Sequence, residues 1–258
     1  MHPVRIAELL QPFLADDRVT AALSEARGLT PDDLHDISTY INVIRRWNAR
    51  INLTAIRDPE AIVTRHFGES LFAARRLFPG ATVALQSLPR ACREGRVSDA
   101  GGPGTLGPQG AAQDLRPDAD ARPSVADVGS GAGFPGLPIK LWASDISLTL
   151  IEPNHKKAAF LREITRALRL TDVNILAARA EALLAGSFQV VTLRAVERFA
   201  AVLPAAASLV APEGRLAMLI GSAQLDQARS SLPRFCWENP ISIPLSRSRI
   251  LAVAFRVK

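Results

Sequence analysis

The feature best suited to binding a ligand is a glycine-rich stretch at 129–136. A short apolar run, 125–128, contains Asp127 and leads directly into it. Glycine has no Cβ and adopts positive φ, so such a loop lets the backbone approach a ligand closely at the end of a strand. We therefore expect a site for a small molecule of nucleotide character. The glycines are Gly129, Gly131, Gly133 and Gly136.

Two ligands fit such a loop. The stretch 131–136 matches the dinucleotide pattern G-x-G-x-x-G, but Pro135 lacks an N–H for a pyrophosphate and Asp127 would repel one. S-adenosylmethionine has no phosphate and carries positive charge, which a nearby carboxylate favours. Glu152, about twenty residues further on, is placed to accept hydrogen bonds from ribose hydroxyls. We expect S-adenosylmethionine, and an NAD-type Rossmann oxidoreductase is the alternative.

From Ser124 onward, strand-like and helix-like segments alternate, and these segments would position the glycine loop. Alternating strands and helices predict an α/β fold, a mostly parallel sheet covered on both faces, with ligands at the carboxyl ends of the strands. Pro153 is expected to begin the helix 153–169, which buries Ala159, Phe160, Ile164 and Leu168. Predicted strands are 124–128, 146–151, 172–177, 188–193, 215–220 and 250–257, with a weaker one at 241–245. Predicted helices are 136–143, 153–169, 198–209 and 222–231.

The first part of the chain, 1–80, is predicted to be a helical extension. Thr30, Pro31 and the acids after them are typical of a helix start. A second helix is expected to open at Asp58, and the polar stretch 48–54 is a predicted loop. The first helix has an apolar face of Leu34, Ile37, Ile41, Ile44 and Trp47, and the second one of Ile62, Val63, Phe67, Leu71 and Ala74.

The middle of the chain has a different composition. Residues 100–123 hold five Gly and four Pro in 24 positions. Such a composition buries too little apolar surface to offset the entropy of ordering. We expect 81–123 to be a flexible insertion between the helical extension and a cofactor-binding core at 124–258.

Composition bounds the function class. The formal net charge is +6, mostly from arginine, which favours a polyanionic partner. The chain has no apolar run of about 20 residues and no signal peptide at its start, so we expect a cytoplasmic protein without a membrane partner. Two cysteines and four histidines without ligand spacing predict no metal site.

Three stretches together resemble one family. DVGSGAGFPGLPIK, LIEPNHKKAAFLRE and RWNARINLTAIRDPEAIVTRHFGESL are similar to the RsmG (GidB) family of 16S rRNA guanine-N7 methyltransferases. The patterns W-N-x-x-x-N-L-T and R-H-F-x-x-S set this family apart from generic methyltransferases. The resemblance covers nearly the whole chain except 81–123.

The resemblance implies a Rossmann-like, seven-stranded class I methyltransferase sheet with an N-terminal helical extension. It also implies methyl transfer from S-adenosylmethionine to N7 of a guanosine in the 530 loop of 16S rRNA, with that RNA or the small ribosomal subunit as partner. N7 is an unprotonated lone pair at neutral pH, so no general base is needed. Alignment of the reacting atoms would be the main contribution of the protein.

The resemblance also implies site residues. Gly129 and Phe134 fall on cofactor-binding positions of the loop, and Ala180 and Glu181 are expected near the adenine. Arg194 is the expected catalytic residue, at the face where cofactor and target meet. It would orient the guanine or a phosphate through paired hydrogen bonds, and an ion pair with Glu197 is the alternative.

Other side chains have two interpretations. Arg65 and His66 are expected to contact RNA, or else to form a solvated helix face with the histidine against the core. Trp47 is expected in the core, and stacking on a base is its alternative. The helix 153–169 carries Lys156, Lys157 and Arg162, which form a solvated face or bind RNA phosphates.

Three positions depart from the family pattern, where Asp, Ser and Lys are usual. They are Gln189, Leu193 and Ile220. A non-catalytic relative that binds rRNA or the ribosome is therefore a further alternative.

Overall fold

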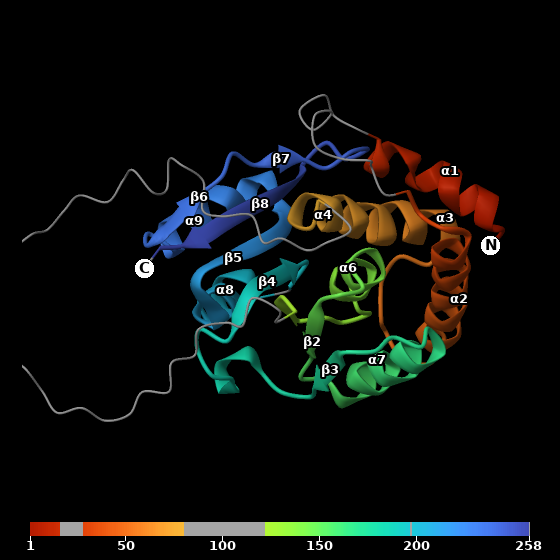
Figure 1. Cartoon of the computed structure of the whole chain (residues 1–258), viewed down its shortest axis with the longest axis horizontal. Coiled ribbons are helices and arrows are strands. Elements are labelled where there is room, and N and C mark those ends of the chain that lie inside the picture. Colours follow the sequence, from red (N-terminus) through yellow and green to blue (C-terminus); the bar gives the residue numbers. More distant parts are fainter. Residues whose placement is uncertain (16–27, 80–121, 197, 258) are drawn as a thin grey trace, which may run out of the picture.

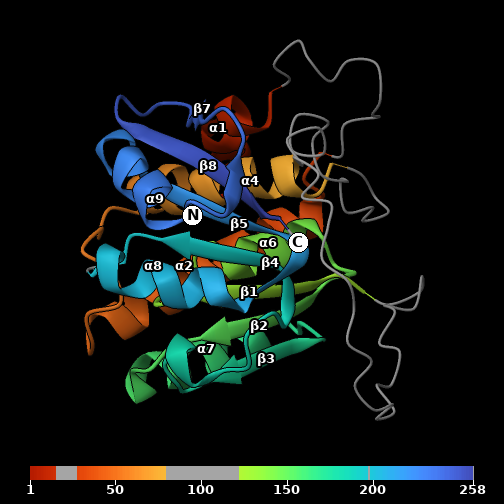
Figure 2. The ribbon, with the colours of Figure 1, turned by 90° about the vertical axis from the view of Figure 1, so that its left-hand side faces the viewer.

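One mixed sheet forms the centre of the protein. The computed structural model describes residues 1–15, 28–79, 122–196 and 198–257. In these residues the sheet has eight strands, in the order β3-β2-β1-β4-β5-β8-β6, and β7 pairs with β8 beside this path (Figure 2). β1 to β5 run parallel, and β8 is antiparallel to its neighbours β5, β6 and β7. The strands are β1 (Ser124–Val128), β2 (Ser147–Ile151), β3 (Val173–Leu176), β4 (Phe188–Arg194), β5 (Val210–Gly221), β6 (Phe235–Trp237), β7 (Ile241–Ser242) and β8 (Arg249–Arg256).

Helices cover both faces of the sheet (Figure 1). In the N-terminal part they are α1 (Pro3–Leu14), α2 (Pro31–Asn48), α3 (Pro59–Ala61), the π-helix η1 (Ile62–Gly68) and α4 (Glu69–Leu77). In the C-terminal part they are α6 (Gly136–Trp142), α7 (His155–Ala167), the short 3-10 helix η2 (Ala180–Ala182), α8 (Phe199–Leu209), the 3-10 helix η3 (Ser222–Gln224) and α9 (Leu225–Ser231).

The strands alternate between two apolar clusters, as the period of two requires. Val125 packs in one cluster with residues of α6, α7 and the N-terminal helices. Ala126 and Val128 pack in the other, beneath α8 and α9. Contacts of α4 with α6 and of α2 with α7 join the N-terminal helices to the sheet layer (Figure 1). The N-terminal helices therefore share a continuous core with the face of the sheet that carries the glycine loop.

The start of α2 is confirmed in detail. The Thr30 hydroxyl accepts a hydrogen bond from the backbone N–H of Asp33, and the Asp33 carboxylate accepts one from the Thr30 N–H. This reciprocal cap satisfies two N–H groups that a helix start otherwise leaves open. The helix predicted to open at Asp58 is also present, continuous from Pro59 to Leu77, and its predicted stripe is buried.

Some predicted details were wrong. The helix α7 begins at His155, because the Asn154 side chain accepts from two backbone N–H groups and acts as the cap after Pro153. Phe160, Ile164 and Leu168 are buried as predicted, but Ala159 is exposed and Ala158 is buried instead. The seven-stranded path is present, but the sequence missed the short strand β6. The weaker strand predicted at 241–245 is present as β7, which pairs with β8 over two residues.

The predicted insertion at 81–123 lies outside the described residues apart from its last two positions. Within the described ranges, the helices are too short or too polar to span a bilayer.

Candidate active site

The glycine loop is fastened to the neighbouring strand by Glu152. This residue follows β2, which lies beside β1 in the sheet. One carboxylate oxygen accepts from the backbone N–H of Gly131 (2.9 Å) and the other from that of Asn154 (2.8 Å). Glu152, the residue predicted to bind the ribose, therefore lies against the loop and is only 5% exposed. Each of its carboxylate oxygens can accept a further hydrogen bond.

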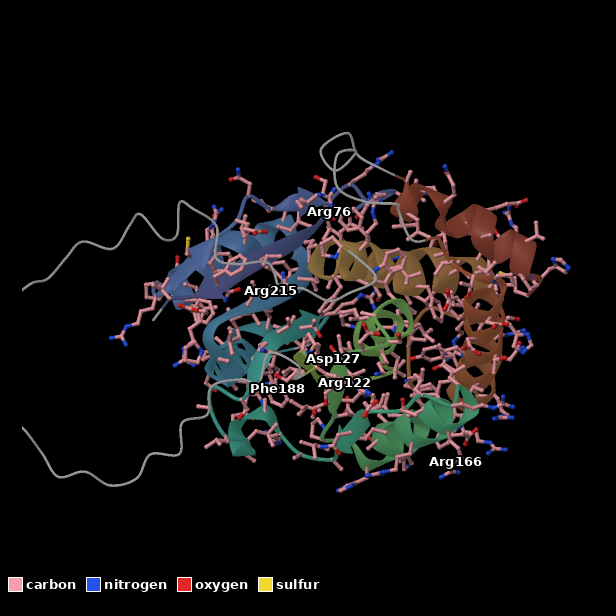
Figure 3. All side chains as sticks on the ribbon, in the orientation of Figure 1. Arg76, Arg122, Asp127, Arg166, Phe188 and Arg215 are labelled. Carbon is pink, nitrogen blue, oxygen red and sulfur yellow. The ribbon has the colours of Figure 1, made fainter. Side chains whose placement is uncertain are left out.

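Asp127 lies beneath the loop, near the centre of the molecule (Figure 3). Its side chain is fully buried, and it accepts from the N–H of Gly136 (3.2 Å) and the hydroxyl of Thr192 (2.8 Å). Burial raises the pKa of Asp127 to about 6, although these hydrogen bonds oppose the shift. Asp127 thus joins β1, β4 and α6, and its contact with a bound cofactor stays a prediction.

An N-terminal residue, Tyr40, contacts the loop directly. Its hydroxyl donates to the carbonyl of Ala132 (2.6 Å), and its ring stacks on Phe134 with centroids 5.3 Å apart. Gly133 has φ of +84°, and a Cβ there would lie 2.3 Å from the Tyr40 hydroxyl. The helix α2 therefore packs directly against the loop. Sequence reasoning missed Tyr40, although its spacing from Ile37 and Ile44 places it on the buried face.

The space beside Gly131 is open in a way that suits a ligand. Gly131 has φ of +56°, and a Cβ added there would meet only the Gly129 carbonyl, at 3.7 Å. At the other glycines of the loop an added Cβ would collide with side chains of the protein. The residues present thus fit a cofactor held along the loop at Gly131. The carboxylates of Asp127 and Glu152 would then lie close to the positive charge of that cofactor.

A second group of residues forms where β4 ends. Arg194 donates to one oxygen of Glu69 from Nε (3.3 Å) and Nη2 (3.1 Å), and Nη2 also donates to the Arg65 carbonyl (2.7 Å). Nη1 donates to Nδ1 of His66 (3.0 Å), and Arg249 Nε donates to the same Glu69 oxygen (3.0 Å). We call Arg194, Glu69, His66 and Arg249 the arginine cluster. It binds β4 and β8 to the continuous helix 59–77.

Arg194 is therefore largely committed to the protein itself. Its side chain is only 8% exposed, and four of its five N–H donors contact described residues. Burial lowers its pKa from the ordinary value, opposed by Glu69. The paired hydrogen bonds expected toward guanine or phosphate are not available in this arrangement, because only one donor remains. The alternative partner Glu197 lies outside the described residues.

His66 is a buried link and not an exposed one. Because its Nδ1 accepts from the Arg194 guanidinium, Nε2 carries the proton and donates to the Thr54 hydroxyl (2.8 Å). Its ring stacks on Phe134 at 4.8 Å. Burial and the nearby arginines lower the pKa of His66 to about 3, so the ring is neutral. His66 lies in the π-helix η1, and π-helical turns occur frequently at functional sites.

The loop after α2 is organised by Asn48. Its side-chain oxygen accepts from the N–H groups of Leu53 and Thr54, and its amide donates to the Thr54 carbonyl. Trp47 packs edge-on against Phe160, with centroids 5.8 Å apart, which agrees with its expected place in the core. The pattern W-N-x-x-x-N-L-T therefore builds a rigid loop that presents Thr54 to His66.

The remaining predicted residues lie elsewhere. Ala180 is buried and Glu181 exposed on η2, which follows β3, and their place near the adenine stays a prediction. Arg65 is exposed, while its carbonyl holds Arg194. On α7, Lys156 and Arg162 are exposed and Lys157 is half-buried.

The three departures from the family pattern do not alter these contacts. Gln189 pairs with Ser124 at the start of β4, at the opposite end from Arg194. Leu193 and Ile220 are buried in the cluster beneath α8 and α9.

Known proteins resemble this chain over most of its length. Residues 33–83 and 113–240 match the family described as rRNA small subunit methyltransferase G (GidB). Relatives named ribosomal RNA small subunit methyltransferase G include one from Halorhodospira halophila, 36% identical over 78% of this chain and 75% of the relative. Another, from Roseiflexus sp., is 33% identical over 91% of this chain and 88% of the relative. The chain therefore belongs to the rRNA small subunit methyltransferase G (GidB) family.

Proposed function

We propose that the protein transfers a methyl group from S-adenosylmethionine to N7 of a guanosine in the 530 loop of 16S rRNA. The observation that carries this proposal is the contact between the glycine loop and the N-terminal helices. His66, in the family motif R-H-F-x-x-S, stacks on Phe134 of the loop, and Tyr40 of α2 donates a hydrogen bond to the loop carbonyl of Ala132.

The residues have separate tasks in this reaction. Glu152 and the loop around Gly131 would hold the cofactor, which supplies an electrophilic methyl group on a sulfonium. Arg194 would act mainly by holding helix 59–77 against β4, with one remaining N–H for the guanine. Since guanine N7 carries no proton, neutral His66 is not required as a base, and alignment can contribute about 7–11 kcal/mol.

A methylation assay tests the proposal. The protein would be incubated with methyl-labelled S-adenosylmethionine and small subunits, or 16S rRNA, from cells that lack the modification. N7-methylguanosine is then mapped by chain cleavage at the modified base. We expect one labelled guanosine in the 530 loop, and no label with a Gly131→Val variant, whose side chain would occupy the open space beside the loop.

Calorimetry separates the alternatives. Binding of S-adenosylhomocysteine without NADH is the expected result. Binding of NADH alone would favour an oxidoreductase, and cofactor binding with no label on any RNA would favour a non-catalytic relative.

A further inference from the structure

A small hollow lies on the helical extension. It is formed by the end of α2, the loop that follows and the start of η1, and its volume is about 190 Å³. Pockets for whole small-molecule ligands span about 300–1,000 Å³, so this hollow suits a single group. It is lined by Ile44, Arg45, Asn48, Ala49, Arg57 and Ile62.

Two arginines of the hollow form no ion pair with any described residue. Arg45 and Arg57 are both exposed, and neither guanidinium has a hydrogen-bond or ion-pair partner in the ranges that the structure describes. Arg45 stands in the last turn of α2, where the helix dipole favours a cation. Arg57 lies in the loop after α2, where no helix dipole favours a cation. An anion held between these two guanidinium groups would be attracted by both of them.

The wall of the hollow is connected to the proposed active site by side chains. Asn48 lines the hollow and holds the backbone of Thr54. The Thr54 hydroxyl bonds His66, and His66 accepts from Arg194. Three consecutive contacts thus lead from the hollow to the residue at the end of β4, through side chains that are half-buried or buried.

We propose that this hollow holds a backbone phosphate of the substrate RNA strand, next to the nucleotide that is methylated. Arg45 and Arg57 would contact the phosphate oxygens, since guanidinium groups match phosphate geometry. The apolar side chains of Ile44 and Ile62 would lie against the adjoining sugar. The site would fix the position of the strand without reading its sequence. This inference depends on the proposed function.

The test compares two double variants that lose the same charge. Arg45→Gln with Arg57→Gln empties the hollow of cations, and Arg229→Gln with Arg234→Gln removes two exposed arginines in and after α9, on the other face of the sheet. A hairpin of the 530 loop is titrated against each at several salt concentrations, together with S-adenosylhomocysteine. Methylation kinetics give KM and kcat for the RNA.

We expect the first variant to bind the hairpin roughly tenfold more weakly than the second, because hydrogen bonds to a charged phosphate are lost. The slope of log K against log salt should fall by about 0.7–1, the contribution of one phosphate. KM should rise with little change in kcat, and S-adenosylhomocysteine affinity should not change. Equal affinities and slopes for the two variants would overturn the inference.

Two further outcomes are decisive. If the unsubstituted protein neither binds nor methylates the RNA, the proposed function fails, whatever the variants do. If inorganic phosphate or AMP binds the unsubstituted protein and not the Arg45, Arg57 variant, while hairpin binding is the same in both, the hollow is a site for free phosphate, which also overturns the assignment to RNA.

Discussion

Two glycines of the same loop should respond differently to the same substitution. Gly131 and Gly133 both have positive φ, so alanine at either position carries a backbone strain of about 1–2 kcal/mol. At Gly131 the new methyl group has free space. At Gly133 it would lie 2.3 Å from the Tyr40 hydroxyl and 2.6 Å from a methyl carbon of Leu137.

The size of the difference follows from those contacts. The Tyr40 ring is fully buried and stacked, so the hydroxyl can move away only by giving up its hydrogen bond to Ala132. Losing that bond inside the core costs about 1–3 kcal/mol, and overpacking against Leu137 costs about 1–3 kcal/mol. Gly133→Ala should therefore lower the free energy of unfolding by at least about 2 kcal/mol more than Gly131→Ala.

Urea unfolding of both variants measures this difference, and titration with S-adenosylhomocysteine measures the site. We expect Gly131→Ala to weaken the cofactor product with a small change in stability. Tyr40→Phe removes the same hydrogen bond, so combining it with Gly133→Ala should cost less than the sum of the two. Equal loss of stability for the two alanine variants, or strict additivity with Tyr40→Phe, would refute the reasoning.

Two predictions concern the arginine cluster. Glu69→Gln leaves two largely buried guanidinium groups without their carboxylate and should lower the free energy of unfolding by about 3–5 kcal/mol, whereas the exposed pair partner Glu163→Gln should cost about 0–1 kcal/mol; similar losses in urea titrations would contradict this. The pKa of His66 is about 3 in the folded protein against an ordinary 6.5, so the unfolded chain binds the extra proton between these values and stability falls as pH is lowered through that window. Asp127, with its pKa raised to about 6, acts in the opposite direction, so the unsubstituted protein alone does not isolate His66. The measurement is therefore the free energy of unfolding lost between pH 7.5 and pH 5 in the unsubstituted protein, minus the same loss in the His66→Gln variant. That difference should be positive, and a value of zero would show that His66 is not held neutral.

Local patterns were enough to predict most elements. The capping residues of α2 and the apolar spacing of helix 59–77 act within a few residues, so their sequence signals are direct. The strand β6 was missed because three half-buried residues carry no readable period. The first residue of α7 was misplaced by two positions, because a proline and an asparagine both fit a helix start and only the hydrogen bonds distinguish them.

The sequence by itself determined the type of fold, the glycine loop with its two carboxylates, and the family. These depend on short-range spacing that survives without knowledge of what lies opposite. Only the tertiary structure decided what Arg194 contacts, because its partners Glu69 and His66 are separated from it by 125 and 128 positions of chain. It also placed Tyr40 on the loop, 92 positions from the carbonyl it holds. Burial and countercharge arise where distant segments meet. They place Arg194 between the sheet and the helical extension, and its contact with cofactor or RNA stays a prediction.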